Sequence, residues 1–195
     1  LCSIRQSAVD RAMAAATKTE GKLIITGCII ESDKKKMSEL SDYLLDIREL
    51  PKWPEIIGLG PSLPLEDYFE IEPISSRYIP IMTGCNNFCS YCVVPFTRGR
   101  EYSRPFDKIV SEAKRAISVG VKEIWLLGQN VDSYRDGRLG LADLIKEIDL
   151  ITGDFWISFL SSHPKDLTQE IIESVVNSKK ATHYINLPVQ SGDDT

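Results

Sequence analysis

Tyr78-Ile-Pro-Ile-Met82 leads into the loop Gly84-Cys85-Asn-Asn-Phe-Cys89-Ser-Tyr-Cys92. The first run predicts a short buried strand, because it is apolar and ends at a loop. The loop supplies three thiolates within eight residues, enough to bind three irons of a cubane iron–sulfur cluster and leave the fourth iron open. A fully ligated cluster only transfers electrons, whereas an open iron can bind and activate a small molecule.

A structural zinc site is the alternative interpretation of the same cysteines. It would use Cys89 and Cys92 with a third cysteine and a histidine. Zinc sites normally have four ligands, and both histidines, His163 and His183, lie far along the chain and not at zinc-finger spacing. An iron–sulfur cluster is therefore favoured.

Beyond the loop, predicted strands alternate with predicted helices, which indicates parallel β/α units. The expected strands are 78–82, 123–127, 156–159 and 184–187, and the expected helices are 105–119, 139–150 and 167–177. The helix after Pro105 has an apolar face of Phe106, Ile109, Val110, Ala113 and Ile117. In such folds ligands bind at the carboxyl ends of the strands, so loops 84–99, 128–132, 161–163 and 190–192 are expected to converge on one site.

The chain before the loop predicts a separate, smaller α/β domain. A helix is expected at 7–17 and a strand at 22–26, with 1–4 as the end of an earlier strand. Weak patterns are found at 43–45 and 50–57. The charged run 33–36 is assigned to the surface. Residues 59–72 are rich in Pro, Gly and acids and predict a linker. The expected domains are 1–58 and 73–195.

Composition excludes several classes of protein. With 43% hydrophobic and 26% charged residues and no apolar run near ~20 residues, the sequence is not that of a membrane protein. Five cysteines with no leader segment favour a metal site in the cytoplasm over a disulfide framework. A net charge of −5 gives no overall attraction to nucleic acid, so any RNA contact needs a local patch. Because the chain begins at Leu1 and stops in a polar segment, we expect it to be a fragment.

The cysteine spacing, with Tyr91 just before the last cysteine and a strand just before the loop, resembles the radical S-adenosylmethionine superfamily. The resemblance implies that Cys85, Cys89 and Cys92 bind a 4Fe-4S cluster in a partial parallel (β/α) barrel. It also implies that S-adenosylmethionine chelates the open iron and is cleaved to a 5′-deoxyadenosyl radical.

Further motifs narrow the resemblance to the methylthiotransferases. They are Val93-Val-Pro-Phe-Thr-Arg-Gly-Arg100, Ser103-Arg-Pro105, Gly128-Gln-Asn-Val131, Ser161-Ser-His-Pro164 and Leu187-Pro-Val-Gln-Ser-Gly192. The chain is most similar to the branch that makes 2-methylthio-isopentenyladenosine in tRNA. Cys2 and Cys28 then match two of the three ligands of a second 4Fe-4S cluster, whose third ligand is expected upstream of Leu1. Without the resemblance, two cysteines at this separation are more often buried small hydrophobes than cluster ligands.

Other polar residues are candidates for cofactor and RNA binding. Gln129, Asn130, Gln190 and Ser191 are expected to bind S-adenosylmethionine, although loop amides also satisfy their own turns. His163 either lines the site or is a hydrogen-bonded loop residue. A basic and aromatic strip follows the cysteine loop and could bind RNA phosphates and a flipped-out base. It consists of Arg98, Arg100 and Arg104, interleaved with Phe96 and Tyr102. The alternative is that Glu101 and Asp107 pair with these arginines.

The resemblance implies a cytoplasmic enzyme that adds a methylthio group to carbon 2 of isopentenylated adenosine beside the tRNA anticodon. Its partners would be the tRNA anticodon stem-loop and an electron donor such as flavodoxin or ferredoxin, and the protein is expected to be a monomer. Alternatives are a methylthiotransferase for threonylcarbamoyl-adenosine or a ribosomal protein, and a non-catalytic iron–sulfur or zinc scaffold that binds RNA. Because one auxiliary-cluster cysteine and the C-terminal RNA-binding domain are expected to lie outside the fragment, the fragment itself is not expected to be fully active.

Overall fold

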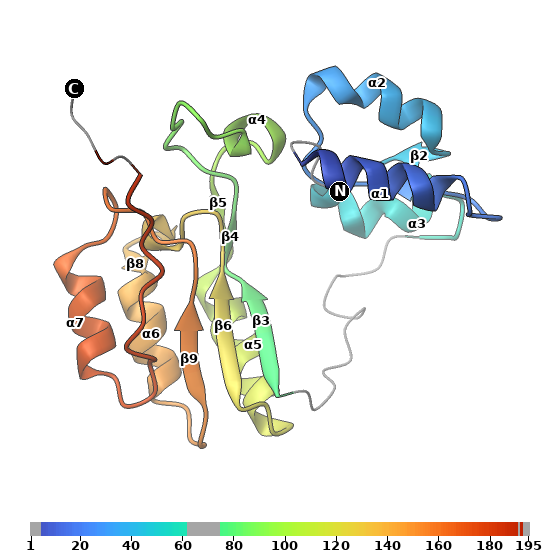
Figure 1. Ribbon diagram of the computed structural model, residues 1–195. Helices are drawn as coiled ribbons and strands as arrows, with labels where there is room; N and C mark the ends of the chain where they lie inside the picture. Colours follow the sequence, from blue (N-terminus) through green and yellow to red (C-terminus); the bar gives the residue numbers. More distant parts are fainter. Residues whose placement is uncertain (1–4, 62–74, 191, 193–195) are drawn as a thin grey trace. The chain divides into compact units, whose positions relative to one another are not determined.

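The computed structural model describes residues 5–61, 75–190 and 192. These residues divide into two compact units (Figure 1). One contains residues 5–61 and 89–98, and the other contains residues 75–88 and 99–190. No helix in the described part of the chain is long and apolar enough to cross a membrane.

The first unit is a small α/β assembly. Its elements are α1 (Gln6–Ala16), β1 (Ile24–Ile25), α2 (Glu31–Leu40), β2 (Tyr43–Leu44), the 3-10 helix η1 (Ile47–Lys52), α3 (Trp53–Ile56) and α4 (Val94–Thr97). Strands β1 and β2 pair in parallel. Its buried centre is small and consists of Val9, Ile25 and Met37. The helix expected at 7–17 and the strand expected at 22–26 are both present in shorter or shifted form.

The run 33–36, assigned to the surface from sequence, lies inside helix α2. Helix α2 buries only Met37, so its sequence has no apolar stripe from which it could be predicted. The weak pattern at 50–57 corresponds to the end of η1 followed by α3. The strand expected at 1–4 lies outside the described residues.

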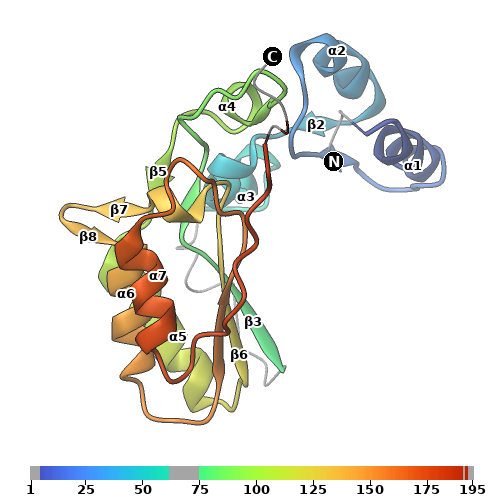
Figure 2. The same ribbon diagram turned by 60° about the vertical axis from the view of Figure 1, so that its left-hand side comes forward.

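The second unit is built on a three-stranded parallel sheet. Strands β3 (Ser76–Pro80), β6 (Glu123–Leu127) and β9 (Trp156–Phe159) lie side by side in that order, with Tyr78 opposite Trp125 and Trp125 opposite Ser158. Helices α5 (Phe106–Ser118), α6 (Leu141–Asp149) and α7 (Gln169–Asn177) cover one face of this sheet (Figure 2). The predicted parallel α/β class is confirmed.

The core lies between the sheet and these helices. Alternate strand residues point toward the helices, and Ile79, Leu126 and Phe159 are buried there. Helix α5 supplies the apolar face expected of it: Ile109, Val110 and Ala113 are buried, and Phe106 and Ile117 pack against the core. Burying a side chain of this size stabilises the fold by about 1.5–3 kcal/mol.

Several small elements lie beyond the carboxyl ends of the sheet strands. Met82–Thr83 (β4) pairs antiparallel with Tyr102–Ser103 (β5), so the strand expected at 78–82 is divided between β3 and β4. The 3-10 helix η3 (Val131–Ser133) follows β6, and Arg135–Asp136 (β7) pairs antiparallel with Leu139–Gly140 (β8) ahead of α6.

The prediction of a strand at 184–187 is wrong. Ala181 makes a single isolated bridge to Ile157, and residues 182–190 contain no strand. Ser162 N still donates to Asn186 O at 3.2 Å, and Ile185 packs against the core. Tyr184 and Leu187 are exposed, and the backbone of 184–187 makes too few sheet hydrogen bonds to be a strand.

Candidate functional site

The cysteine loop begins at the carboxyl end of the sheet and is closed at its base. Strands β4 and β5 pair Met82 with Ser103 and Thr83 with Tyr102, and Cys85 N donates to Gly99 O at 3.3 Å. Gly84 opens the loop with a left-handed φ of +76°, and a Cβ placed there would meet the Arg100 carbonyl oxygen at 2.1 Å. Only glycine fits this close backbone approach.

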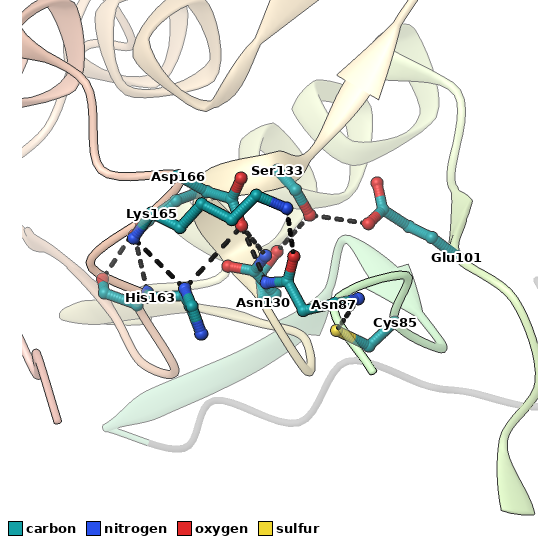
Figure 3. Close-up of polar contacts among 10 residues, drawn as sticks. Cys85, Asn87, Glu101, Asn130, Ser133, His163, Lys165 and Asp166 are labelled. Atoms are coloured by element: carbon teal, nitrogen blue, oxygen red, sulfur yellow. Dashed lines mark hydrogen bonds and ion pairs between the residues drawn. The ribbon is translucent and has the colours of Figure 1, made fainter. Parts of the chain in front are cut away.

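Cys85 belongs to the second unit and is 8% exposed. Its Sγ accepts a hydrogen bond from Asn87 N at 3.5 Å (Figure 3). Phe88 follows with a φ of +50°, which is uncommon for a bulky side chain, and the Arg100 guanidinium lies 4.4 Å from the centre of its ring. The first half of the loop is thus bent tightly around Cys85.

Cys89 and Cys92 belong to the first unit, together with Cys28. Cys92 N donates to Cys89 O at 2.8 Å, which closes a tight turn. Partial desolvation and the adjacent Cys89 and Cys92 raise the pKa of the Tyr91 hydroxyl above 10.0. Arg98 Nε donates to Cys28 Sγ at 3.0 Å, a contact that no sequence signal predicted.

Cys28, Cys85, Cys89 and Cys92 form no disulfide with one another. Among residues 5–61 and 75–190, no three or more His, Cys, Asp or Glu side chains gather so as to hold a single metal ion. Binding of an iron–sulfur cluster, or of zinc, by these cysteines stays a prediction.

Gln129 and Asn130 follow β6, and both contact other loops. Gln129 Oε1 accepts from Gly84 N at 2.8 Å, so it holds the entrance of the cysteine loop. Asn130 is 2% exposed and donates through Nδ2 to Asp166 Oδ2 at 2.7 Å. Asn130 Oδ1 is buried without a hydrogen-bond partner among the described residues. A buried acceptor of this kind is available to a bound ligand, and cofactor binding by both residues stays a prediction.

Asp166, which follows β9, is the centre of the polar network in Figure 3. Its Oδ2 accepts from Asn87 Nδ2 at 2.8 Å as well as from Asn130. Lys165 Nζ donates to Asn87 Oδ1 at 3.0 Å, so both ends of the Asn87 amide are bound. Partial burial raises the pKa of Asp166, but the two amide donors, Lys165 and His163 outweigh it and the pKa is lowered below 3.8.

A second carboxylate, Asp132, fixes the loop after β9. It is 5% exposed and accepts from Ser162 Oγ at 3.0 Å and from His163 N at 2.9 Å. Burial raises the pKa of Asp132 although these hydrogen bonds oppose the rise. His163 Nδ1 accepts from Lys165 N at 3.2 Å, so His163 is hydrogen-bonded within its loop, and its lining of the site stays a prediction.

The three arginines have different surroundings. Arg98 contacts Cys28, and Arg100 lies over Phe88. Arg104 pairs with Glu112 at 3.0 Å and donates to Pro80 O at 2.6 Å.

Glu101 and Asp107 were the alternative partners considered for these arginines. Glu101 accepts from Ser133 Oγ at 2.7 Å, and burial raises its pKa. Arg104 pairs with Glu112, which lies five residues beyond Asp107 in helix α5. RNA binding by Arg98, Arg100 and Arg104 stays a prediction.

The structure brings three of the four predicted loops together. Asn87, Asn130 and Asp166 join the loops after β4, β6 and β9, and Val131 N donates to Ser161 O at 3.1 Å. In the fourth loop Gln190 is exposed with a φ of +67°. Ser191 and Cys2 lie outside the described residues.

Sequence reasoning missed Asn87, Lys165 and Asp166. Asn87 lies between two of the cysteines, and Lys165 and Asp166 lie two and three residues beyond His163. Extending the strand-end rule by one turn after 161–163 would have found the last two.

Comparison with known proteins agrees with this geometry. The family model described as the radical SAM superfamily matches residues 79–195. Three similar curated proteins all carry the name tRNA-2-methylthio-N(6)-dimethylallyladenosine synthase. The protein from Dehalococcoides mccartyi strain CBDB1 is 43% identical over 180 residues, covering 89% of this chain and 41% of that protein. The protein from Treponema denticola is 35% identical, covering all of this chain and 52% of that protein. The protein from Syntrophus aciditrophicus is 49% identical over 122 residues, covering 61% of this chain and 26% of that protein.

The chain spans about two fifths to one half of the length of the relatives that it matches over most of its own length. The matched region contains strands β6 and β9, the end of β3, the helices that cover the sheet and the three cysteines of the loop. This chain belongs to the radical S-adenosylmethionine superfamily, and its second unit is part of the superfamily's β/α barrel.

Proposed function

We propose that this chain is the cluster-binding part of a cytoplasmic enzyme that adds a methylthio group to carbon 2 of an isopentenylated adenosine beside the tRNA anticodon. The observation that carries the proposal is the cysteine loop, closed by β4 and β5 at the carboxyl end of a parallel sheet. The names of the similar proteins support tRNA and this nucleoside over a threonylcarbamoyl-adenosine or a ribosomal protein.

Cys85, Cys89 and Cys92 would each bind one iron of a 4Fe-4S cluster. When bound, such a cluster supplies the electron that breaks a carbon–sulfur bond of S-adenosylmethionine. The surrounding residues hold the loop and limit the access of water: Gln129 binds the amide of Gly84, and Cys85 is almost wholly buried. The buried Oδ1 of Asn130 is suited to accept a hydrogen bond from the cofactor.

Cys28, with Cys2 and a third cysteine, would bind the second 4Fe-4S cluster. Arg98 supports this role, because its guanidinium donates a hydrogen bond to the Cys28 sulfur. Arg100 and Arg104 would contact the tRNA anticodon stem-loop. We further propose a monomer that receives electrons from a flavodoxin or ferredoxin.

The cluster can be tested on the full-length protein. Anaerobic reconstitution should give about eight irons per chain, four for each cluster. Cys89→Ala should remove about half of them, whereas Ser90→Ala, an exposed neighbour in the same loop, should remove none. A colourless protein that contains zinc would refute the proposal.

The substrate can be tested by nucleoside analysis of tRNA. A strain that lacks the full-length protein should accumulate isopentenyladenosine in place of its methylthio derivative. If the methylthio derivative persists unchanged, the proposed substrate is wrong. Loss of a methylthio group from threonylcarbamoyl-adenosine or from a ribosomal protein would identify one of the alternatives.

A further inference from the structure

The first half of the cysteine loop needs contacts from outside itself to keep its shape. Gly84 and Phe88 both have left-handed backbone conformations, with φ of +76° and +50°. For a bulky residue such as Phe88 this conformation is strained, and it persists only where the surroundings enforce it. The residue immediately before Phe88 is Asn87, whose backbone N–H also donates to Cys85 Sγ.

The Asn87 side chain is bound at both of its polar atoms by residues that follow β9. Asp166 Oδ2 accepts from its Nδ2 at 2.8 Å, and Lys165 Nζ donates to its Oδ1 at 3.0 Å. The same Asp166 oxygen accepts from the buried Asn130 at 2.7 Å. One carboxylate oxygen therefore joins the cysteine loop to the ends of β6 and β9 (Figure 3).

We propose that Asp166 is a positioning residue that, with Lys165, clamps Asn87 and thereby holds Cys85 in place for cluster binding. This inference rests on the proposed function, because the cluster gives the clamp its purpose. Hydrogen bonds to an ionised carboxylate are stronger than those between neutral groups. A neutral replacement of equal size therefore weakens the clamp without emptying the space.

Asp166→Asn is the central test, made in the full-length protein. The new amide oxygen carries no negative charge, so the hydrogen bonds that it accepts from Asn87 and Asn130 are no longer charge-assisted. In the protein without its cluster, Cys85 of this variant should react with iodoacetamide about tenfold faster than Cys85 of the wild type. Loss of one charge-assisted hydrogen bond should raise the population of the locally opened loop by about this factor. With iron and sulfide, the variant should lose its loop cluster to a chelator faster and show an altered electron paramagnetic resonance spectrum.

Asp149→Asn is the matched control. Asp149 is a carboxylate of the same unit that accepts from Ser178, Lys179 and Lys180. It ends helix α6, away from the cysteine loop. The control should leave the Cys85 alkylation rate and the cluster spectrum unchanged. If both variants accelerate Cys85 alkylation equally, the effect is general loosening of the fold and the inference is wrong.

A swap of the two partners tests the pairing itself. Asn87→Asp alone places two carboxylates together and should also loosen the loop. The double variant Asn87→Asp with Asp166→Asn restores complementary groups, because the new carboxylate at position 87 can accept from Lys165 and from the new amide at position 166. Recovery of slow Cys85 alkylation and of the wild-type spectrum in the double variant would support the clamp. Failure to recover would overturn it.

The outcomes separate this inference from the proposed function. If the wild-type protein takes up iron and Asp166→Asn behaves like it in both measurements, the clamp is refuted and the proposed function stands. If the wild-type protein takes up no iron, the proposed function fails, and the purpose assigned to the clamp fails with it.

Discussion

Gly84→Ala should be among the most damaging single substitutions in the second unit. Alanine at a φ of +76° costs about 1–2 kcal/mol in backbone strain. Its Cβ would also lie 2.1 Å from the Arg100 carbonyl oxygen and 2.7 Å from that of Gly99. Both are backbone atoms, so the loop must move, and overpacking of this kind costs about 1–3 kcal/mol. The expected total loss in free energy of unfolding is about 2–5 kcal/mol.

Gly137→Ala is a control that measures the cost of backbone strain without a steric clash. Gly137 has a φ of +59° in the same unit, but a Cβ there meets nothing within 4 Å. Gly137→Ala should therefore cost only the strain, about 1–2 kcal/mol.

The assay is urea unfolding followed by tryptophan fluorescence. Trp125 and Trp156 both lie in the sheet of this unit. Trp53 of the other unit should be replaced by phenylalanine in every protein compared. If the two alanine variants are equally destabilised, the close approach at Gly84 does not constrain the loop and the reasoning is refuted.

Three further predictions concern the same unit. Glu112→Gln should lower the free energy of unfolding by about 3 kcal/mol, because it removes the carboxylate that pairs with both Arg77 and Arg104 from a site where the Glu112 side chain is 12% exposed. A loss below about 1 kcal/mol in urea unfolding would show the pairs to be marginal. Thr168→Ala should cost about 1 kcal/mol, because the Thr168 hydroxyl caps helix α7, and Thr168→Ser should cost much less. The stability that Asp166 contributes should be complete above its unfolded pKa of about 3.8 and disappear as the pH falls through its lowered folded pKa. The gap in unfolding free energy between wild type and Asp166→Asn should therefore stay constant at neutral pH and shrink as the pH falls below about 3.8, and a gap that stays constant in acid would contradict the assignment.

The sheet and its helices were predictable because their patterns are strong. Strands 123–127 and 156–159 were predicted with the bounds that the structure gives to β6 and β9. Helix α5 begins after a proline and carries an apolar stripe, so its position followed from propensity and periodicity. Helix α2 offered neither signal, since only Met37 is buried in it.

The site was predictable in its chemistry and less so in its contacts. The cysteine spacing indicated the cluster, and the strand-end rule indicated Gln129 and Asn130. The sequence could not show that Gln129 would bind the amide of Gly84, or that Asp166 would reach Asn87, because each contact joins residues far apart in the chain. Arg98 and Cys28 illustrate the same limit, since nothing local to either residue specifies the other.

The antiparallel pair of β4 and β5 has a consequence for how the loop can vary among related proteins. Because residues 82–83 and 102–103 are hydrogen-bonded at its base, the entropic cost of closing the loop is met there. That cost rises only logarithmically with length, by about 0.6 kcal/mol for each doubling. A residue added between Cys92 and Gly99 would therefore raise the closure cost only slightly. The base of the loop, and not its length, sets the positions of Gly84 and Cys85.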